Sequence, residues 1–364
     1  MKTTRYAVTS VKSGMILAED VYNSSDQLVL NAGTVLTDRS ITRLKFYSIH
    51  EVLIDTSPAK TEVKTRIRPS DVPTYTERVK RSEDYRTFAK SYKSTLDLFQ
   101  NRISQFALTR KGLNAQELLD SVKQTFSTAE TTGKIFDMLM CIRSLDDITF
   151  VHGMNVALIS MLFGQWLGYS KEDCEVLMLA GLLHDIGKLK IPPEILKKKG
   201  SLTSEEFDII KSHPLEGYNL LKDQNLDDRV VVSALPHHER CDGTGSPNGL
   251  KGAHIHDFAT IISIADVYDA MTASRCYRGP ICPLEVLNAF ESEGLSKYDP
   301  KFLLTFMDKV VSTYLHQYVL LNNGNVGEIV MINKHSPARP IIRMLNSECL
   351  DLSRERSISI VGIV

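Results

Sequence analysis

The chain is organised around residues 180–193, AGLLHDIGKLKIPP, in which His184, Asp185 and Lys188 carry the reactive side chains. The apolar residues before His184 recur at helical spacing, so this stretch predicts a buried helix. On that helix Lys188 lies three residues after Asp185 and four after His184, so the three side chains lie close together. A neutral imidazole and a carboxylate at the end of a buried helix favour a metal site, and Lys188 would neutralise an anion brought to it. Taken alone, the stretch also fits a buried His–Asp pair that satisfies itself.

The bulk composition limits the class of protein. A length of 364 residues exceeds one ordinary hydrophobic core, so we expect two or three domains. Hydrophobic residues make up 43% of the chain and charged residues 24%, which is typical of a soluble globular protein. The net charge of −1 implies no strong overall field, which disfavours nonspecific binding to DNA and a basic membrane-binding surface.

The cysteines and the apolar runs bear on the compartment. None of the six cysteines forms a Cys-x-x-Cys pair, and Cys141 and Cys174 fall within apolar helical patterns, so we expect free thiols in a reducing compartment. The first residues lack the apolar core of a secretion signal. Residues 151–168 are barely long enough to span a bilayer and contain His152, Asn155 and Gln165, so they predict a core helix. We therefore expect a cytoplasmic protein without a membrane span.

The first part of the chain predicts a small module and a connector. Residues 1–56 show short apolar runs between turns rich in Gly, Asn and Asp, with a short helix expected over 41–47, which indicates an α+β module. Residues 57–82 are polar and contain prolines, which indicates a linker. Residues 83–140 have apolar positions three and four apart and predict connecting helices, which could pack within one chain or form a homodimer.

Residues 141–318 predict an all-helical domain, so the predicted fold class is mainly α. Ser170 is expected to cap the helix that ends at His184, and Thr203 with Glu206 has the spacing of a capping box. A further apolar helix is predicted over 259–271. Short apolar runs at 327–332, 340–344 and 357–361 predict strands, so residues 319–364 form the expected C-terminal β appendage.

Five of the ten histidines lie in the helical region at helix ends or beside another potential ligand. They are His152, His184, His213, His237 and His238. Asp185 and Asp266 accompany them, and Asp266 follows an apolar run, where an unpaired buried charge would be costly. Asp269 lies three residues further on and could orient a ligand. Any one of these histidines could be a satisfied core residue, but the whole set favours a metal centre.

The set of potential ligands is too large for one metal and suits two, with Asp185 between them. Histidine nitrogen and carboxylate oxygen favour iron, manganese or zinc-like ions, and the lack of cysteine ligands argues against a structural thiolate site. Two neighbouring metals would hold a hydroxide and an anionic substrate for in-line displacement at phosphorus.

This series of residues resembles the HD-domain phosphohydrolases. The series runs His152, His184-Asp185, His213-Pro214, His237-His238-Glu239 and Asp266. Features similar to the HD-GYP subfamily accompany it: Lys188, Ile191-Pro192, Gly217, Asp242-Gly243-x-Gly245-x-Pro247 and Arg275-x-Tyr277-Arg278. The resemblance covers about residues 140–290. The first module, with GMILA at 14–18 and GTVLT at 33–37, resembles the module that often precedes such domains.

The resemblance implies a bacterial signalling enzyme with an HD-type fold. Its expected activity is hydrolysis of cyclic di-GMP to linear pGpG, GMP or both, through a hydroxide bound to two divalent metals, iron or manganese. The metal ligands it implies are His152, His184, Asp185, His213, His237, His238 and Asp266. The catalytic residues it implies are Asp185 and Lys188. The substrate-binding residues are Lys188, Asp269, Arg275, Arg278, Gly245 and Pro247, with the arginines on the phosphates.

Two positions depart from the subfamily's pattern. Ser246 stands where the subfamily has tyrosine, so the loop can keep its turn but lacks the aromatic face. Ile148 stands where some members have a glutamate that holds a third metal, so we predict two metals. The altered loop leaves alternatives open: a receptor that binds cyclic di-GMP or a protein without cleaving it, and a hydrolase of another cyclic dinucleotide or of a linear phosphoester.

Overall fold

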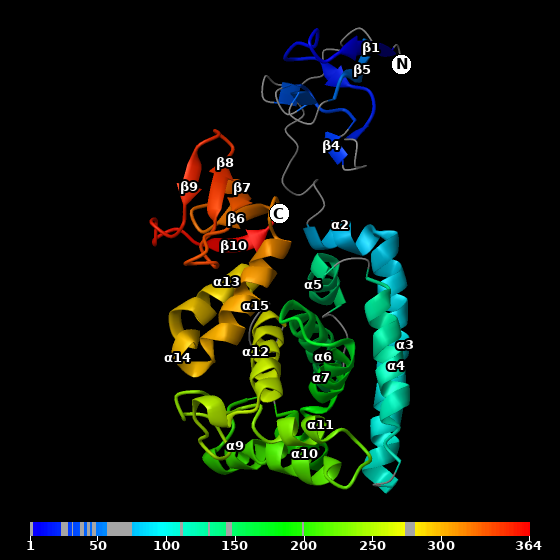
Figure 1. Cartoon of the computed structure of the whole chain (residues 1–364), viewed down its shortest axis with the longest axis vertical. Coiled ribbons are helices and arrows are strands. Elements are labelled where there is room, and N and C mark those ends of the chain that lie inside the picture. The colour runs from blue at the N-terminus through cyan, green and yellow to red at the C-terminus, as the bar shows by residue number, and fades with distance from the viewer. Residues whose placement is uncertain are drawn as a thin grey trace. The chain divides into compact units, whose positions relative to one another are not determined.

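The structure, a computed structural model, describes residues 3–22, 28–30, 32–36, 40–41, 44–45, 49–56, 75–109, 112–129, 132–142, 148–198, 200–273 and 281–364. The chain divides into two compact units, residues 1–72 and residues 73–364, which we call unit 1 and unit 2 (Figure 1). Each unit has its own apolar core. The finer boundaries at residues 56, 140 and 318 stay predictions.

Unit 1 is built from short antiparallel strands. β5 (Glu51–Asp55) lies between β1 (Thr3–Ala7) and β2 (Ile16–Leu17), and β3 (Val21–Tyr22) pairs with β4 (Leu28–Leu30). The buried side chains of the core include Leu17, Leu36, Leu44 and Ile54. The helix expected over 41–47 falls largely outside the described residues.

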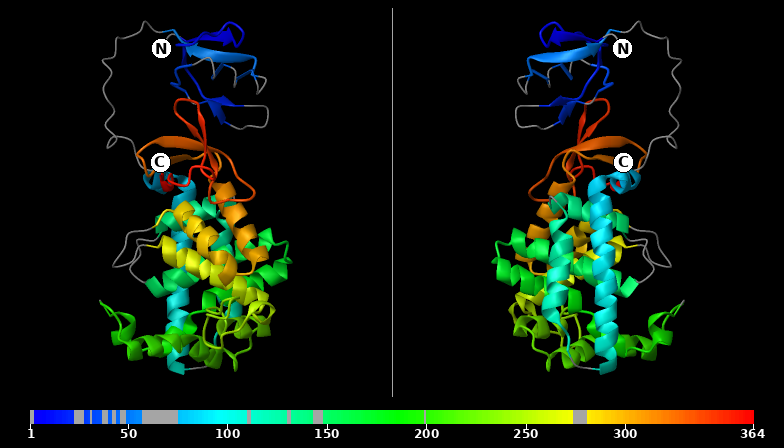
Figure 2. Two further views of the ribbon diagram at one scale, coloured as in Figure 1. Left: turned by 90° about the vertical axis from the view of Figure 1, so that its left-hand side faces the viewer. Right: turned by 90° about the vertical axis from the view of Figure 1, so that its right-hand side faces the viewer.

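Unit 2 opens with helices on one side of the helical body. α3 (Glu83–Thr109) and α4 (Ala115–Ser127) run side by side there, and α5 (Thr132–Ile142) follows (Figures 1 and 2). α3 buries one apolar face at the predicted spacing of three and four residues. The prediction of a linker over residues 57–82 is wrong for its last part, because α2 (Tyr75–Arg81) lies there. Only Tyr75 of α2 is buried, so this helix has no apolar periodicity for the sequence to reveal.

The centre of unit 2 consists of α6 (Ile148–Trp166), α7 (Lys171–Leu183) and α12 (Asp257–Thr272) (Figure 1). α6 is buried on nearly every side, which explains why its sequence is apolar all round. α6 and α7 approach closely at Gly181, where a Cβ atom would lie 3.1 Å from Cα of Ala157. The prediction of a core helix is confirmed. Among the described residues, no helix has both the length and the apolar character that crossing a bilayer requires.

Local signals set several helix ends. The Ser170 side chain accepts a hydrogen bond from the backbone N–H of Asp173 and caps α7, as predicted. Thr203 and Glu206 form the predicted capping box of α9 (Ser204–Lys211). The helix predicted to end at His184 ends there, with His184 as the C-cap after Leu183. The expectation that Lys188 lies on the same helix is wrong, because a 3-10 helix, η2 (Ile186–Lys190), follows.

The turn into η2 has a packing reason. Gly187 lies against the first residue of α10 (His213–Leu221), where a Cβ atom would come within 1.9 Å of the His213 carbonyl oxygen. Only glycine fits this close approach. The remaining helices of unit 2 are α8 (Pro193–Leu196), α11 (Asp228–Ala234), η3 (Gly252–His254), α13 (Pro283–Ala289), η4 (Phe290–Gly294), α14 (Leu295–Lys297) and α15 (Pro300–Thr313).

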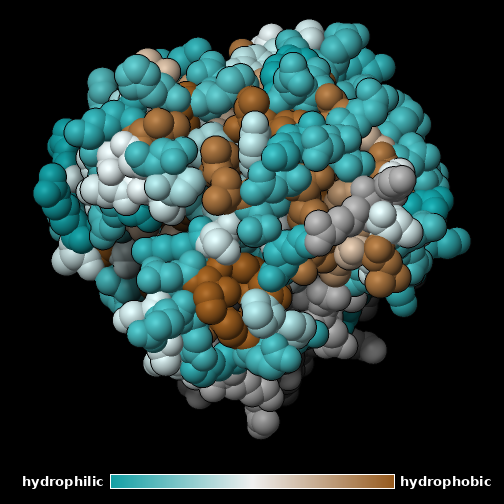
Figure 3. Space-filling view, turned by 90° about the horizontal axis from the view of Figure 1, so that it is seen from below, coloured by the Kyte–Doolittle hydropathy of each residue, from teal (hydrophilic) through white to brown (hydrophobic). Residues whose placement is uncertain are grey.

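α9 and α10 lie at one end of unit 2, and Figure 3 shows that end with brown apolar side chains among teal polar ones. The exposed apolar side chains of these two helices include Phe207, Ile209 and Leu215. No side chain of α9 is buried. α9 therefore adds little to the core and serves to lead the chain to His213.

The C-terminal residues form a five-stranded antiparallel sheet in the order β10-β6-β7-β8-β9. Its strands are β6 (Tyr318–Leu321), β7 (Val326–Met331), β8 (Ile341–Met344), β9 (Cys349–Asp351) and β10 (Ile360–Ile363). The sequence predicted β7, β8 and the region of β10 but missed β6 and β9. Val319, Ile329 and Ile342 belong to the same core as the helices, so the sheet is part of unit 2. The predicted fold class, mainly α with small sheets at both ends, is confirmed.

Candidate metal centre

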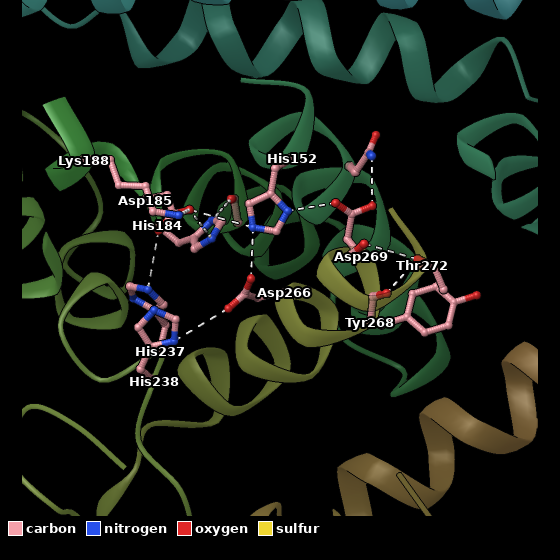
Figure 4. A network of polar contacts seen from close by, with 12 residues as sticks. His152, His184, Asp185, Lys188, His237, His238, Asp266, Tyr268, Asp269 and Thr272 are labelled. Atoms are coloured by element: carbon pink, nitrogen blue, oxygen red, sulfur yellow. Dashed lines mark hydrogen bonds and ion pairs between the residues drawn. The ribbon is translucent and has the colours of Figure 1, made fainter. Parts of the chain in front are cut away.

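The elements at the centre of unit 2 bring the predicted ligands to one place (Figure 4). The residues that converge are His152, His184, Asp185, His213, His237, His238 and Asp266. His152 and Asp266 come from the middle of the buried helices α6 and α12. The others stand where α7, α9 and α11 end and where η2 and α10 begin. Residues that are more than 100 positions apart in sequence therefore meet, because these seven helices converge.

Two ligand groups can be distinguished, and they share Asp185. In the first group, Oδ2 of Asp185 lies 3.4 Å from Nε2 of His184 and 3.8 Å from Nε2 of His152. In the second group, Oδ1 of Asp185 lies 3.2 Å from Nε2 of His213 and 3.9 Å from Nε2 of His237. His238 completes the second group. One carboxylate oxygen faces each group, which is the arrangement a bridging ligand needs.

Asp266 links the same two groups from the opposite side. Its Oδ1 lies 2.9 Å from Nε2 of His152, and its Oδ2 lies 3.7 Å from Nδ1 of His238. Asp266 is 8% exposed and Asp185 is 7% exposed. Two buried carboxylates thus stand among histidines with little access to water, and such charges are stable only when paired or coordinated.

Three of the histidines are oriented in the same way. Each follows a helix end, and its Nδ1 lies 2.7 Å from a backbone carbonyl three residues earlier: His184 from Gly181, His213 from Ile210 and His237 from Ala234. Carbonyls in the last turn of a helix lack a helical partner, so the ring nitrogen supplies one. The proton assigned to Nδ1 leaves the lone pair of Nε2 directed into the site.

The side chains fit a divalent cation. With protons on Nδ1, Nε2 of His213 and Nε2 of His237 are both acceptors, yet they lie 3.3 Å apart. Nε2 of His184 and Oδ1 of Asp185 are buried without a hydrogen-bond partner. Facing acceptors repel each other, and buried unpaired acceptors are costly, unless a cation lies between them. Nitrogen and oxygen donors without thiolate are those of iron, manganese and zinc.

The protonation states agree with ligation. Burial lowers the pKa of His184 and lowers that of His237 well below its ordinary value, so both rings are neutral near pH 7. Burial also lowers the pKa of His238 to about 4. For Asp185, burial raises the pKa, but the charge of Lys188 beside it is the main opposing effect, and the pKa stays well below its ordinary value. His237 and His238 of the second group are thus ready to bind a cation without losing protons.

His152 differs from the other histidines. Burial lowers its pKa, but hydrogen bonds to Asp266 and Asp269 outweigh that effect and raise the pKa to about 10. Nδ1 of His152 lies 2.8 Å from Oδ2 of Asp269, and the amide of Asn155 donates to the other oxygen of Asp269 at 2.9 Å. Without a cation the ring is an imidazolium held between two carboxylates.

Lys188 lies at the edge of the site. Its ammonium pairs with Oδ2 of Asp185, and its side chain is 24% exposed. The group is therefore fixed beside the shared carboxylate and still reachable from solvent, which is what an anion brought to the cluster would require.

The loop after His238 is held by a residue that the sequence reading did not single out for function. Glu239 is 2% exposed, and its carboxylate accepts hydrogen bonds from the backbone N–H groups of Asn248 at 2.6 Å and Leu250 at 3.0 Å. A Cβ atom on Gly245 would come within 2.4 Å of Cα of Glu239, so only glycine fits there. The backbone N–H of Ser246 donates to the His238 carbonyl at 3.2 Å. The described contacts of the loop therefore do not use the side chain at position 246.

The remaining predicted substrate residues stand differently. Asp269 is 1% exposed and lies behind His152, a placement that favours an orienting role over the predicted contact with substrate. Pro247 lies in the loop held by Glu239. Arg275 and Arg278 lie outside the described residues. Ile148 is the first residue of α6 and offers no ligand atom. Asn155, which supports Asp269, was missed because a single polar residue in an apolar helix gives no functional signal.

Comparison with known proteins agrees with this geometry. Residues 115–302, just over half of the chain, match the family model described as HD domain. The chain therefore belongs to the HD-domain family, and its relatives support membership of the HD-GYP subfamily.

Three similar proteins illustrate the relationship. The cyclic di-GMP phosphodiesterase PdeB of Borreliella burgdorferi is 30% identical over 210 residues, covering 57% of this chain and 55% of that protein. The 3'3'-cGAMP-specific phosphodiesterase 1 of Vibrio cholerae is 41% identical over 145 residues, covering 40% of this chain and 34% of that protein. The solved structure of Bd1817, a HDG"Y"P protein from Bdellovibrio bacteriovorus, is 18% identical with a TM-score of 0.43, covering 84% of this chain and 98% of that one. The chain spans about half the length, or less, of these two phosphodiesterases.

Proposed function

We propose that this chain is a metal-dependent phosphodiesterase that hydrolyses cyclic di-GMP to linear pGpG, GMP or both. The observation that carries the proposal is the pair of ligand groups that share Asp185, with Lys188 fixed at their edge. Phosphodiesterases acting on cyclic di-GMP among the relatives support the choice of substrate.

The cofactor in this proposal is a pair of divalent cations, iron or manganese. His152, His184 and Asp185 would hold one, and Asp185, His213, His237 and His238 the other, with Asp266 beside both. Bound divalent cations polarise a phosphodiester and lower the pKa of water from about 15.7 towards roughly 7, which supplies a nucleophile at neutral pH.

The chain's own residues bind and orient the phosphate. Lys188 would donate to a nonbridging oxygen, where a preorganised cationic donor is typically worth about 3 kcal/mol in the transition state. Asp185 holds that ammonium in place through their ion pair. Arg275 and Arg278 would meet the substrate's phosphates, since guanidinium groups bind phosphate in a bidentate manner.

The test is turnover of cyclic di-GMP under anaerobic conditions by protein reconstituted with Fe²⁺ or Mn²⁺. Nucleotides are separated by chromatography and bound metal is counted in the same sample. We expect linear product and about two cations per chain, as for other binuclear sites. His184→Ala and Asp185→Ala should lose both metal and turnover, whereas His335→Ala, an exposed histidine of the C-terminal sheet region, should keep both. Full activity in Asp185→Ala would overturn the proposal.

A second candidate is favoured by Ser246, which replaces the aromatic residue of the loop. It is a receptor that binds cyclic di-GMP without cleaving it, and it predicts saturable binding with no product over hours, even with two cations bound. Turnover is also measured with 3'3'-cGAMP and a linear phosphodiester, because one relative is a cGAMP-specific phosphodiesterase. These substrates distinguish a receptor, which cleaves none of them, from an enzyme with another substrate. If one of these compounds is cleaved faster than cyclic di-GMP, that compound would be the preferred substrate.

A further inference from the structure

Tyr92 lies on α3, before the residues that match the HD-domain model, and is fully buried. Its hydroxyl lies 2.8 Å from Oδ1 of Asn155 and 3.0 Å from the carbonyl oxygen of Val151, and it donates to this pair of acceptors on α6. A buried phenol needs a hydrogen-bond partner, and here both partners stand within three residues of His152.

The hydrogen bonds continue from Asn155 to the metal centre. Because the Tyr92 hydroxyl faces Oδ1 of Asn155, the amide nitrogen points to Asp269 and donates to its Oδ1 at 2.9 Å. The other oxygen of Asp269 bonds Nδ1 of His152 at 2.8 Å (Figure 4). Asn155 and Asp269 are each 1% exposed, so no solvent competes for these bonds. A flipped amide would turn its oxygen towards the Asp269 carboxylate, which would repel it, and the bond from the Tyr92 hydroxyl to Oδ1 supports the same unflipped orientation.

Apolar packing fixes the same contact between α3 and α6. The ring of Phe99 on α3 meets the ring of Phe150 edge to face, with centroids 5.4 Å apart. A Cβ atom on Gly153 would lie 3.5 Å from the Phe99 ring. α3 therefore touches α6 on both sides of His152 in the sequence, and a shift of α3 along α6 would strain these contacts and the hydrogen bonds together.

We propose that Tyr92 is a positioning residue of the metal centre, which acts through Asn155 and Asp269 to fix the ring of His152. The proposal deepens the function proposed above and rests on it in one respect, that His152 binds a divalent cation. It makes α3, a helix that precedes the matched HD region, part of the machinery that sets cation affinity.

The test compares Tyr92→Phe with Thr95→Val on the same helix. Thr95 is 4% exposed and bonds α4 instead, with its Oγ1 2.8 Å from Oγ of Ser121 and 2.9 Å from Oγ1 of Thr125. Each variant removes a buried hydroxyl from α3, but only Tyr92→Phe interrupts the route to His152. Mn²⁺ affinity is measured on the full chain from the electron paramagnetic resonance signal of free Mn²⁺.

Loss of an outer partner of a ligating histidine typically weakens metal binding by about 10–100-fold, and Tyr92 stands two steps beyond that partner, because Asn155 lies between it and Asp269. We expect Tyr92→Phe to weaken one class of Mn²⁺ site by roughly 3–10-fold and Thr95→Val to stay within about twofold of the parent. Equal affinities in the two variants would overturn the inference while leaving the proposed function standing. A parent protein that binds no Mn²⁺ would instead remove the proposed function, and the inference with it.

Asn155→Ala tests the same route from its middle. It should weaken the same site by roughly 10-fold or more, and adding Tyr92→Phe should then cost nothing further, because the route is already broken. Additive losses in the double variant, or an unchanged affinity in Asn155→Ala, would each overturn the inference. If Tyr92→Phe does not fold, Asn155→Ala alone keeps the inference falsifiable, because an unchanged affinity in that variant would overturn it.

Discussion

At the scale of single residues, the three histidines that follow helix ends show how a ligand can be oriented by the backbone alone. His184, His213 and His237 each bond a carbonyl three residues earlier, so the ring direction is set wherever the helix ends. The sequence revealed the histidines and the helix ends, and hence which side chains come together. It could not reveal the roles of Asn155, whose partner Asp269 lies in a distant segment, or of Glu239, which binds backbone N–H groups of the loop that follows it.

Lys188 offers a prediction at this scale. Lys188→Gln should lower kcat by roughly 100-fold with bound metal unchanged, because it removes a donor of about 3 kcal/mol from the transition state. Lys190→Gln is the matched control, since Lys190 is exposed on the same short helix. Steady-state kinetics with metal counted in each sample measures the difference. Similar kcat values in the two variants would argue against a catalytic role for Lys188.

The pKa of His152 predicts proton release on cation binding. A pKa of about 10 means that the ring is protonated at pH 7.5, and ligation through Nε2 requires that proton to leave. Affinity at the first ligand group should therefore rise about tenfold per pH unit up to the pKa. His238, with a pKa of about 4, and the neutral His237 have no proton to release in the same range.

Isothermal titration of Mn²⁺ into the protein at pH 7.5, in buffers with different ionisation enthalpies, measures this release. About one proton should leave His152 per cation at the first group, and none should leave His237 or His238 at the second. Heats that do not depend on the buffer would contradict the prediction, and His152→Ala should abolish the buffer dependence.

At the scale of elements, apolar periodicity was a reliable guide to helices that bury one face or all faces. α3, α4 and α12 appear where their patterns predicted them. Apolar periodicity failed where a helix buries few side chains or where a contact with a distant segment decides the local structure. α2 buries only Tyr75, and the change from α7 to η2 follows from the contact of Gly187 with α10, which no local pattern encodes.

The contact between α2 and α5 predicts a pH-dependent stability. Burial raises the pKa of Asp137 on α5 to about 6, although a hydrogen bond from Tyr75 on α2 lowers it. A carboxyl group with a folded pKa above its unfolded value near 3.8 stabilises the fold at low pH and loses that contribution as pH rises to about 6. The loss amounts to roughly 3 kcal/mol.

Asp137→Asn keeps an acceptor for Tyr75 and has no proton to lose. The free energies of unfolding of the variant and the parent are measured in urea at pH 4 and at pH 7. The difference, variant minus parent, should be about 2–3 kcal/mol larger at pH 7 than at pH 4. A difference that does not change with pH would show that Asp137 titrates normally. Asp208→Asn, on the peripheral helix α9, is the control and should show no such change.

At the scale of the whole molecule, the two units have separate cores, and only unit 2 carries the ligand groups. A cation that binds the folded state at 100 times its Kd stabilises it by about 2.7 kcal/mol per site. In scanning calorimetry, Mn²⁺ should raise the unfolding temperature of unit 2 by roughly 5–10 °C and leave the transition of unit 1 in place. His184→Ala should remove this shift, and a shift of both transitions would mean that Mn²⁺ acts outside the centre.

The convergence of distant segments on Asp185 has a consequence for chain topology. A cation held by His152 and Asp266 closes a loop of about 115 residues, and a covalent cross-link of that span would restrict the unfolded chain by roughly 4–5 kcal/mol. The described cysteines are all free, so the chain has no disulfide of its own among them. A cation bound by these residues would therefore act as a reversible cross-link between distant segments, which a chelator would open and added metal would close again.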